Sequence, residues 1–469
     1  MNLSSHVRPA PTRRDFLLQA GGGFGALALS YLLGRDSIAS GATLVSPNVF
    51  PRAKSVIWLF MEGGPSHLDL FDPKPMLTKM SGQPMPRSFG RVITAMGTAG
   101  NTLLASKRTF KQHGQSGLWI SDWHPEVAKH ADDLCMIRSC WADGLNHVGS
   151  VCEMNTGSIL AGRPSMGAWI NYGLGSVNDN LPAFVVLTDA AEVNGGPTNW
   201  SAGFLPATYQ GTHFRREGTP VFHLTPPKGV DDREQRGKLD LLHQLNAGFD
   251  AHHADDSNLT ARINSYELAY RMQTAAPEAV DISRESEATK KLYGLDDRKT
   301  MITGSNCLLA RRLVERGVRF VQVYSGSGSG WDAHGDVEDN HSKMCRSCDK
   351  PIAGLLADLK SRGLLDDTLV VWGGEFGRTP FNENGKGRDH NPWGFTMWMA
   401  GGGARGGTAV GSTDEIGLRA QDRPCHVSDV HATILYLMGL DHLKLTYLHN
   451  GRHERATVNS GEVIREVIA

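Results

Sequence analysis

The sequence predicts an α/β protein with a mostly parallel central sheet and helices on both of its faces. Short β-branched runs, which are typical of buried strands, alternate along the chain with longer segments whose apolar residues recur at helical spacing. This alternation favours parallel strands joined by helices. The 54 glycines indicate many tight loops between these elements, and a chain of 469 residues with 40% hydrophobic residues can build a sizeable core.

The expected strands share an apolar, β-branched composition and bounds marked by glycine or polar residues. In chain order they are residues 55–61, 183–188, 318–324, 368–372 and 395–400. The expected helices each end at a glycine, which readily takes up the left-handed conformation that closes a helix. They are residues 302–316, 351–362 and 428–438.

We expect a single domain over residues 50–469. Between about residues 199 and 288 the sequence pattern changes to polar loops followed by a helical segment at 266–273, which indicates an insertion or a helical cap.

The N-terminal region has the pattern of an export signal and not of a folded domain. Residues 12–18 (TRRDFLL) resemble a twin-arginine export signal, followed by a weakly apolar stretch and small residues at 39–42.

We therefore expect residues 1–42 to be a twin-arginine (Tat) signal peptide and the protein to be periplasmic or extracellular, with the Tat translocon as a partner during export. The alternative is a short membrane anchor or a buried helix, but the stretch is short and rich in glycine. No later segment is long and apolar enough to predict a stable membrane span.

Charge and cysteine content narrow the function classes. The net charge is −1 with a pI of about 7.0, so no basic surplus indicates a nucleic-acid partner. The seven cysteines cannot all pair with one another. Cys345 and Cys348 form a lone C-x-x-C without a second pair at zinc-finger spacing, which favours packing or a disulfide over a metal site.

Acidic or histidine-rich, glycine-hinged loops follow three of the expected strands. In a parallel sheet such loops meet at one edge, where ligands bind. Carboxylates and imidazoles gathered there suit a divalent metal such as zinc or manganese. Taken singly, each of these side chains is more simply explained as a helix cap or a loop hydrogen-bonding group. The candidates in these loops are Glu62, Ser66, His67, Asp332, His334, His341, Glu375, Asp389 and His390.

Longer motifs carry a family resemblance. They are EGGPSHLDLFDPKP at 62–75, NWSAGFLPATYQGT at 199–212, WDAHGD at 331–336, GGEFGRTP at 373–380 and GRDHNPWGF at 387–395. With these motifs the sequence resembles an exported bacterial family, domain of unknown function 1501, which is grouped with the alkaline phosphatase and sulfatase superfamily. The resemblance implies an alkaline phosphatase/sulfatase-like sheet. It also implies metal ligands at Glu62, Asp332, His334, Glu375 and His390.

The same resemblance places His147, ahead of Thr156 and Gly157, where sulfatases carry their nucleophile. No Ser, Thr or Cys stands at that position, and Phe376 replaces a usual metal-binding residue. His147 is therefore a nucleophile, a metal ligand or a proton donor. Ser66 and Ser150 are further hydroxyl candidates. The metal site is reduced to one ion or is supplemented by His67, His341 or Asp389.

Arginines near these motifs are candidates for binding an anionic group. Arg378 and Arg388 can clamp such a group bidentately, with a plain salt bridge as the alternative for each. His431 lies near the start of the helix at 428–438. It is either a helix cap or a residue that orients a metal ligand by hydrogen bonding to it.

We expect an exported, metal-dependent hydrolase of sulfate or phosphate esters that uses zinc, manganese, calcium or magnesium on a small-molecule or polysaccharide substrate. The main alternative is a non-catalytic exported binding protein on a degenerate sulfatase-like scaffold, which Phe376 and the absent hydroxyl nucleophile favour. A third hypothesis is a purely structural role in a surface assembly.

Overall fold

The computed structural model describes residues 49–189, 192–215, 229–250, 257–458 and 460–469. The predicted signal peptide at 1–42 lies outside these residues. Residues from Pro47 onward form one compact unit. Within the described ranges, no helix combines the length and the apolar character needed to cross a bilayer.

The core of the fold is a nine-stranded sheet with the order β12-β4-β11-β8-β1-β7-β5-β6, in which β15 also pairs with β4. Only β11 runs antiparallel to its neighbours β4 and β8; the other pairings are parallel. The strands are β1 (Ser55–Met61), β4 (Leu134–Trp141), β5 (Phe184–Leu187), β6 (Thr212–Phe214), β7 (Phe320–Ser325), β8 (Thr368–Gly373), β11 (Phe395–Ala400), β12 (Thr408–Val410) and β15 (Cys425–His426).

The five strands predicted from sequence are confirmed to within two residues at each end. The sequence did not predict β4, because Arg138 and Ser139 interrupt its apolar run. The mostly parallel α/β class is also confirmed. Alternate residues of β1 point to opposite faces: Ile57 and Leu59 join one hydrophobic cluster, and Trp58 and Phe60 join the other.

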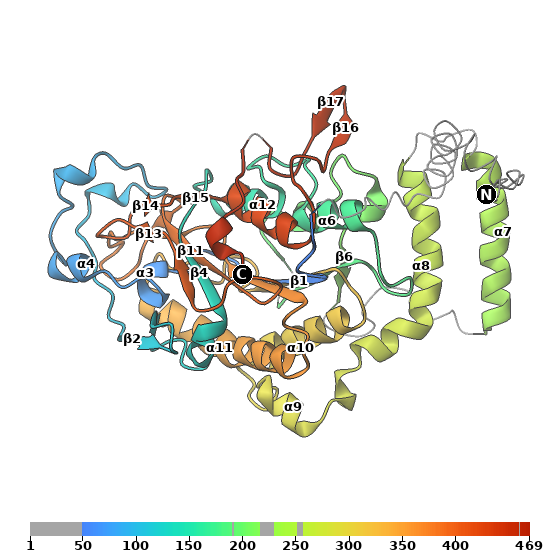
Figure 1. Ribbon diagram of the computed structural model, residues 1–469, viewed down its shortest axis with the longest axis horizontal. Helices are drawn as coiled ribbons and strands as arrows, with labels where there is room; N and C mark the ends of the chain where they lie inside the picture. The colour runs from blue at the N-terminus through green and yellow to red at the C-terminus, as the bar shows by residue number, and fades with distance from the viewer. Residues whose placement is uncertain (1–48, 190–191, 216–228, 251–256, 459) are drawn as a thin grey trace, which may run out of the picture. The chain divides into compact units, whose positions relative to one another are not determined.

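Helices cover both faces of the sheet. Figure 1 shows α10 (Met301–Glu315) and α11 (Val337–Ser361) on one side, with α6 (Met166–Leu174) and α12 (Val427–Leu437) on the other. The second face also carries α5 (His147–Thr156), whose Val151 and Met154 belong to the same cluster as Trp58. A sheet covered in this way explains why its strands are apolar on both faces.

One predicted helix begins earlier than expected. The sequence placed its start at Pro351, but α11 begins at Val337, where the side chain of Asp336 accepts hydrogen bonds from the backbone N–H groups of Glu338 (3.0 Å) and Asp339 (3.2 Å). Pro351 is tolerated inside the helix, where it is buried. The second half of WDAHGDVEDNH is therefore helix, and only its first half is a loop.

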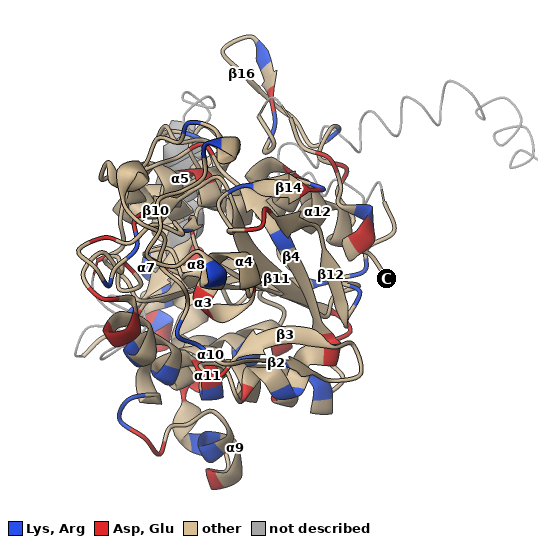
Figure 2. Cartoon of the chain, turned by 90° about the vertical axis from the view of Figure 1, so that its left-hand side faces the viewer, with Lys and Arg blue, Asp and Glu red and all other residues tan. Residues whose placement is uncertain are grey.

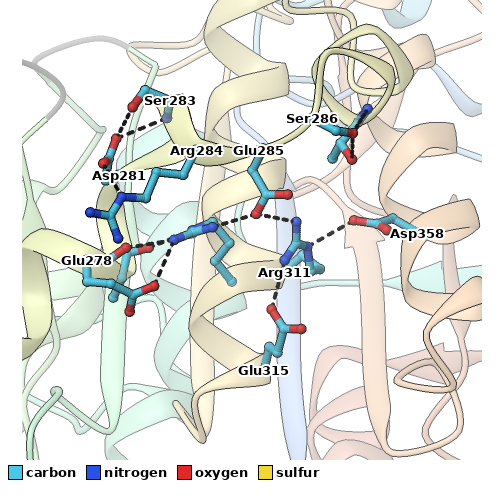
Figure 3. A network of polar contacts seen from close by, with 12 residues as sticks. Glu278, Asp281, Ser283, Arg284, Glu285, Ser286, Arg311, Glu315 and Asp358 are labelled. Carbon is cyan, nitrogen blue, oxygen red and sulfur yellow. Dashed lines mark hydrogen bonds and ion pairs between the residues drawn. The ribbon is translucent and has the colours of Figure 1, made fainter.

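The region around 199–288 contains β6 and two long helices, α7 (Asp232–Asp250) and α8 (Ser257–Val280). Ion pairs anchor the end of α8 to α10, as Figure 3 shows. The guanidinium of Arg312 donates to the carbonyls of Glu278 (2.7 Å) and Ala279 (2.9 Å) and so caps α8. The buried Arg311 pairs with Glu285 (2.7 Å) and with Asp358 of α11 (2.9 Å).

Charge follows this layering. Figure 2 shows Lys and Arg mixed with Asp and Glu along α10 and α11, whereas β11 carries no charge.

All seven cysteines are buried free thiols, and Cys345 and Cys348 lie on the inner face of α11, in the core. Burial raises the pKa of both thiols well above the ordinary value, so neither is poised as a thiolate.

Candidate metal centre and active site

The candidate site lies at the carboxyl edge of the parallel strands. Glu62 follows β1, Asp332 and His334 follow β7, and Glu375 follows β8. His147 is the first residue of α5, which follows β4, and Asn146 caps that helix by accepting from the N–H of Gly149 (2.9 Å). Strands that run in the same direction bring these side chains to one edge, as the sequence predicted.

The loops approach closely because glycines stand where they touch. Gly63 has φ +115°, and a Cβ there would lie 2.6 Å from the backbone nitrogens of Trp331 and Asp332. A Cβ on Gly387 would lie 1.8 Å from the carbonyl oxygen of His334. At Gly63 the loop after β1 therefore packs against the loop that carries Asp332 and His334. At Gly387 the loop that precedes His390 packs against the same loop.

Four side chains meet at this point: His147, Asp332, His334 and His390 each offer an atom within 4.8 Å of the others. The Asp332 Oδ2 lies 3.2 Å from Nε2 of His147, and its Oδ1 lies 3.1 Å from Nε2 of His334. The Nε2 atoms of His334 and His390 are 2.9 Å apart. We call this group the His3Asp cluster.

Each imidazole of the cluster is held through its Nδ1. His147 Nδ1 lies 2.7 Å from Glu375 Oε1, and His334 Nδ1 lies 2.6 Å from Glu383 Oε2. His390 Nδ1 lies 2.8 Å from the carbonyl oxygen of Leu145. Because these partners accept hydrogen bonds, each Nδ1 carries a proton as donor, and whenever the ring is neutral its Nε2 turns a lone pair toward the others.

Three lone pairs and a carboxylate at one point repel one another unless a cation lies between them. A tetrahedral zinc with bonds of about 2.0–2.2 Å separates its ligands by roughly 3.3–3.6 Å. The 3.5 Å contact of Asp332 Oδ1 with His390 Nε2 falls within that spacing, whereas the 3.1 and 3.2 Å contacts of Asp332 with His334 and His147 are of hydrogen-bond length and would lengthen slightly around a cation. The donor set and its spacing therefore fit a divalent metal.

In the metal-free protein, protonation of an imidazole supplies the positive charge that balances Asp332 and Glu375. Burial lowers the pKa of His147, but hydrogen bonds to Asp332 and Glu375 outweigh it and raise that pKa to about 9. Burial likewise opposes ionisation of Asp332, yet contacts with His147, His390 and Arg378 hold the pKa of this carboxyl far below its usual range. Burial lowers the pKa of His390. In the metal-free protein His147 is therefore protonated at neutral pH.

Glu62 and Glu375, both predicted as metal ligands, take other contacts beside the cluster. Both oxygens of Glu375 accept from the N–H of Gly63 (3.0 and 3.1 Å), and Oε1 also meets His147. Glu62 Oε1 accepts from the backbone (2.7 Å) and side chain (2.6 Å) of Asn194. Its buried Oε2 meets no hydrogen-bond partner among the described residues. Burial, aided by the charge of Glu375, raises the pKa of Glu62 to about 7.

The two arginines have different surroundings. Arg378 is fully buried and places Nη1 2.8 Å from Asp332 Oδ1, while its Nε donates to the carbonyl of Gly64 (2.8 Å). Arg388 is also fully buried, but it pairs with Asp69 at 2.8 Å and 3.3 Å and donates to the carbonyl of Thr379 (3.2 Å). Arg378 therefore adjoins the cluster, whereas the donors of Arg388 are used within the protein.

The five predicted supporting residues also make defined contacts. Ser66 Oγ donates to Asp69 (2.5 Å), and its N–H donates to Nε2 of His341 (2.8 Å), which lies on α11. Burial lowers the pKa of His341 to about 3, so this ring is neutral. Asp389 Oδ1 accepts from the N–H of His390 (2.7 Å), which fixes the backbone beside a cluster member.

His67 and His431 are occupied elsewhere. His67 Nε2 donates to the carbonyl of Gly417 (2.9 Å), and burial lowers the pKa of its ring. His431 lies on α12 and donates to the carbonyl of Met154 on α5 (2.8 Å), and burial lowers its pKa to about 4. Both are buried histidines that join elements of the fold, and neither belongs to the His3Asp cluster.

Phe376 packs against the cluster and offers it no ligand atom. Its ring stacks on His390 with centroids 4.4 Å apart and lies 5.1 Å from the ring of His147. A Cβ on Gly64 would come within 2.5 Å of this ring, so the loop after β1 encloses it. Phe376 thus gives the site an apolar wall that holds two imidazoles in place.

Sequence reasoning missed Glu383, Asn194 and Asp69. Glu383 orients His334, Asn194 binds Glu62, and Asp69 neutralises Arg388. Asp69 lies in a quoted motif and could have been found as a counter-charge to a buried arginine. Glu383 and Asn194 belong to none of the quoted motifs and do not stand directly at the end of an expected strand, so no local signal marks them.

Fold and site together define an α/β protein whose sheet presents a histidine-rich, metal-type centre at its carboxyl edge. The chain belongs to the family described as protein of unknown function (DUF1501), whose model matches residues 53–468. This confirms the family resemblance read from the motifs. No curated protein matches the chain in sequence.

Solved structures with a related arrangement come from the alkaline phosphatase and sulfatase superfamily. The lipoteichoic acid synthase LtaP from Listeria monocytogenes is 8% identical over 83% of this chain and 73% of its own, with a TM-score of 0.38. The sulfatase PsFucS1 from Pseudoalteromonas sp. is 13% identical over 83% and 68%, with a TM-score of 0.34. Alkaline phosphatase from the Antarctic bacterium TAB5 is 9% identical over 75% and 92%, with a TM-score of 0.30.

Proposed function

We propose that the protein is a metal-dependent hydrolase of sulfate or phosphate esters. The observation that carries the proposal is the convergence of three Nε2 atoms and the Asp332 carboxylate at the strand ends. Asp332, His334 and His390 would hold a divalent cation, with zinc, manganese, calcium and magnesium as candidates. Such a cation supplies positive charge to the ester oxygens in the transition state.

His147 would carry the proton transfer or the nucleophilic attack. Glu375 accepts from its Nδ1 at 2.7 Å and so fixes both the tautomer and the direction of Nε2. An imidazole held in this way can attack phosphorus or sulfur through Nε2, or it can give a proton from Nε2 to the leaving oxygen. In the metal-free protein His147 is protonated, with a pKa of about 9, so a bound cation must displace this proton before Nε2 can act as the nucleophile.

Arg378 would act through Asp332 and through its charge. Its guanidinium is fully buried and lies 2.8 Å from Asp332, so it holds this carboxylate in place and adds a fixed positive charge beside the reacting group. Arg388, paired with Asp69, would support the site by its main chain instead. Its carbonyl accepts from Arg378 (3.2 Å) and its N–H donates to the carbonyl of Ala333 (3.0 Å).

The site is best tested by turnover with a matched pair of variants. Purified protein loaded with each candidate metal is assayed on aryl phosphate and aryl sulfate esters. His147→Ala should abolish turnover while the metal content and the circular dichroism spectrum stay unchanged. His453→Ala, which removes an exposed imidazole on β17 (Arg452–Glu454), should leave turnover as in the wild type.

Turnover that survives in His147→Ala would refute the role of this histidine. No turnover of any ester by metal-loaded wild type would favour the second candidate function, a non-catalytic binding protein. Phe376 is the observation that favours that alternative, because its ring stacks on His390 where a further metal ligand would otherwise stand. Binding of sulfate or phosphate esters without their cleavage is the result expected of such a protein.

We also propose that the protein is exported through the Tat pathway to the periplasm or beyond. The twin arginines at 13 and 14 and the small residues at 39–42 support this proposal. The substrate would then be a small-molecule or polysaccharide ester outside the cytoplasm. N-terminal sequencing of the exported protein tests it: cleavage near residue 42 is expected, and an intact N-terminus at Met1 would contradict it.

A further inference from the structure

A second group of metal-type side chains lies apart from the His3Asp cluster. Pairing of β15 with β4 sets His426 beside Trp141, and Asp143 follows β4 two residues later. Glu153 faces them from α5. The Asp143, Glu153 and His426 side chains each offer a donor atom within 4.8 Å of the others, and none of them belongs to the first cluster.

The spacing within this group is longer than hydrogen bonds but suits a shared cation. His426 Nε2 lies 3.4 Å from Glu153 Oε1 and 3.5 Å from Asp143 Oδ2. N–H···O bonds are usually about 2.7–3.2 Å long, whereas ligands of a tetrahedral zinc are roughly 3.3–3.6 Å apart. The Nε2 atom is itself buried and has no hydrogen-bond partner in the described part of the chain.

The two inner donors are already held in place. Glu153 is buried, and its oxygens accept from the N–H groups of Asp143 (3.1 Å) and Gly144 (3.0 Å), which leaves lone pairs directed at His426. Nδ1 of His426 accepts from the backbone N–H of Ser428 (3.2 Å) and so caps α12, and Ser428 Oγ lies 3.0 Å from the same atom. A metal on Nε2 therefore requires the imidazole proton to move to Nδ1, where Ser428 Oγ can accept it. Only Asp143, with 62% of its side chain exposed, must be ordered on binding.

A hollow of about 630 Å³ opens in front of these donors. Trp141, Leu443, Arg455 and Glu462 line it together with Asp143 and His426. The ring of Trp141 lies 4.5 Å from that of His426 and supports the imidazole from the side. Three protein ligands with an open face toward a hollow are the arrangement of a metal that also binds water or a small ligand.

We propose that Asp143, Glu153 and His426 form a second divalent-cation site, open to this hollow and separate from the His3Asp cluster. The two sites share one structural link. Glu153 fixes the backbone of Asp143 and Gly144, and the next carbonyl, that of Leu145, holds Nδ1 of His390. A cation at the second site therefore stabilises the loop that leads into His147, whichever reaction the first site performs.

Zinc titration of the full mature chain, followed by isothermal titration calorimetry and by metal analysis after gel filtration, tests the proposal. The Asp332→Ala/His334→Ala variant removes the first site and should still bind one zinc. Adding His426→Asn should abolish that zinc, because asparagine retains a capping oxygen for α12 but loses the imidazole nitrogen. Adding Asp143→Asn instead should weaken binding at least about tenfold, since one charged ligand is lost.

Anomalous diffraction at the zinc edge locates the ion directly. The proposal predicts a peak between Asp143, Glu153 and His426 in zinc-soaked crystals, in addition to any peak at the first cluster. It is overturned if zinc occupies the first cluster while this position stays without a peak. Equal zinc content in the first-site variant with and without His426→Asn would overturn it as well. Neither result depends on whether the protein hydrolyses esters.

Discussion

Replacing Glu62 by glutamine should stabilise the metal-free protein, which is an uncommon result for a buried residue. Glu62 is fully buried, and its Oε2 lacks a hydrogen-bond partner within the ranges described. Burial and the neighbouring Glu375 raise its pKa from 4.5 to about 7. Each tenfold change in a protonation equilibrium is worth about 1.36 kcal/mol, so ionising Glu62 in the folded protein costs about 3 kcal/mol at pH 8.

The sign follows from linkage. The carboxyl group binds its proton more tightly in the folded than in the unfolded protein, so its contribution to stability is complete below pH 4.5 and is lost as the pH rises to about 7. Glutamine is uncharged and keeps an oxygen for the two hydrogen bonds from Asn194. Glu62→Gln should therefore match the wild type near pH 4.5 and exceed its unfolding free energy by up to about 3 kcal/mol at pH 8.

Urea unfolding of both proteins in the presence of a chelator, at half-unit steps from pH 4.5 to 8.5, measures this difference. Glu287→Gln serves as the control because 89% of its side chain is exposed, and its effect should stay within about 0.5 kcal/mol at every pH. A difference between Glu62→Gln and wild type that is flat with pH, or a loss of stability at pH 8, would refute the reasoning. The expected result would indicate that the charge is kept for function at a cost in stability.

Three further predictions concern neighbouring groups. Glu383→Gln should weaken metal binding about 10–100-fold in calorimetry, because the carboxylate that fixes His334 at 2.6 Å is lost, and unchanged affinity would exclude that role. Asp69→Ala should lower the free energy of unfolding in urea by about 3–5 kcal/mol, because it leaves the buried Arg388 without its counter-charge. Asp69→Ala/Arg388→Met should recover much of this loss. Equal stability of the single and double variants would contradict the prediction. Metal affinity should rise up to about tenfold per pH unit until about pH 9, because the cation displaces the proton of His147, and this slope should vanish in His147→Ala.

The sequence predicted the sheet and the edge at which the site forms, because both depend on local patterns. Each apolar run marks a strand, and the residue after it marks the carboxyl edge, so Asp332 and His334 were placed correctly relative to β7. His341 shows where this reasoning stops. It lies in the same acidic stretch, but Asp336 begins a helix there, and His341 turns toward Ser66 with a neutral ring.

The contacts that tune the site were beyond local patterns. Glu383 reaches His334 over 49 positions in sequence, and Asn194 reaches Glu62 over 132. Pairs so far apart are set by the packing of loops, which neither strand nor helix periodicity records. Arg378 and Arg388 were equivalent in the sequence, and only burial beside Asp332 in one case and beside Asp69 in the other distinguishes them.

The central claim is that the His3Asp cluster holds a divalent metal. Elemental analysis of the purified mature protein by inductively coupled plasma mass spectrometry, beside His426→Asn and Asp332→Ala/His334→Ala/His426→Asn, tests it most directly. The account predicts near-stoichiometric metal in His426→Asn and none in the triple variant. His426→Asn that stays metal-free after reconstitution with zinc, manganese, calcium and magnesium would contradict the account and leave Asp332 and His334 as members of a proton-bridged cluster.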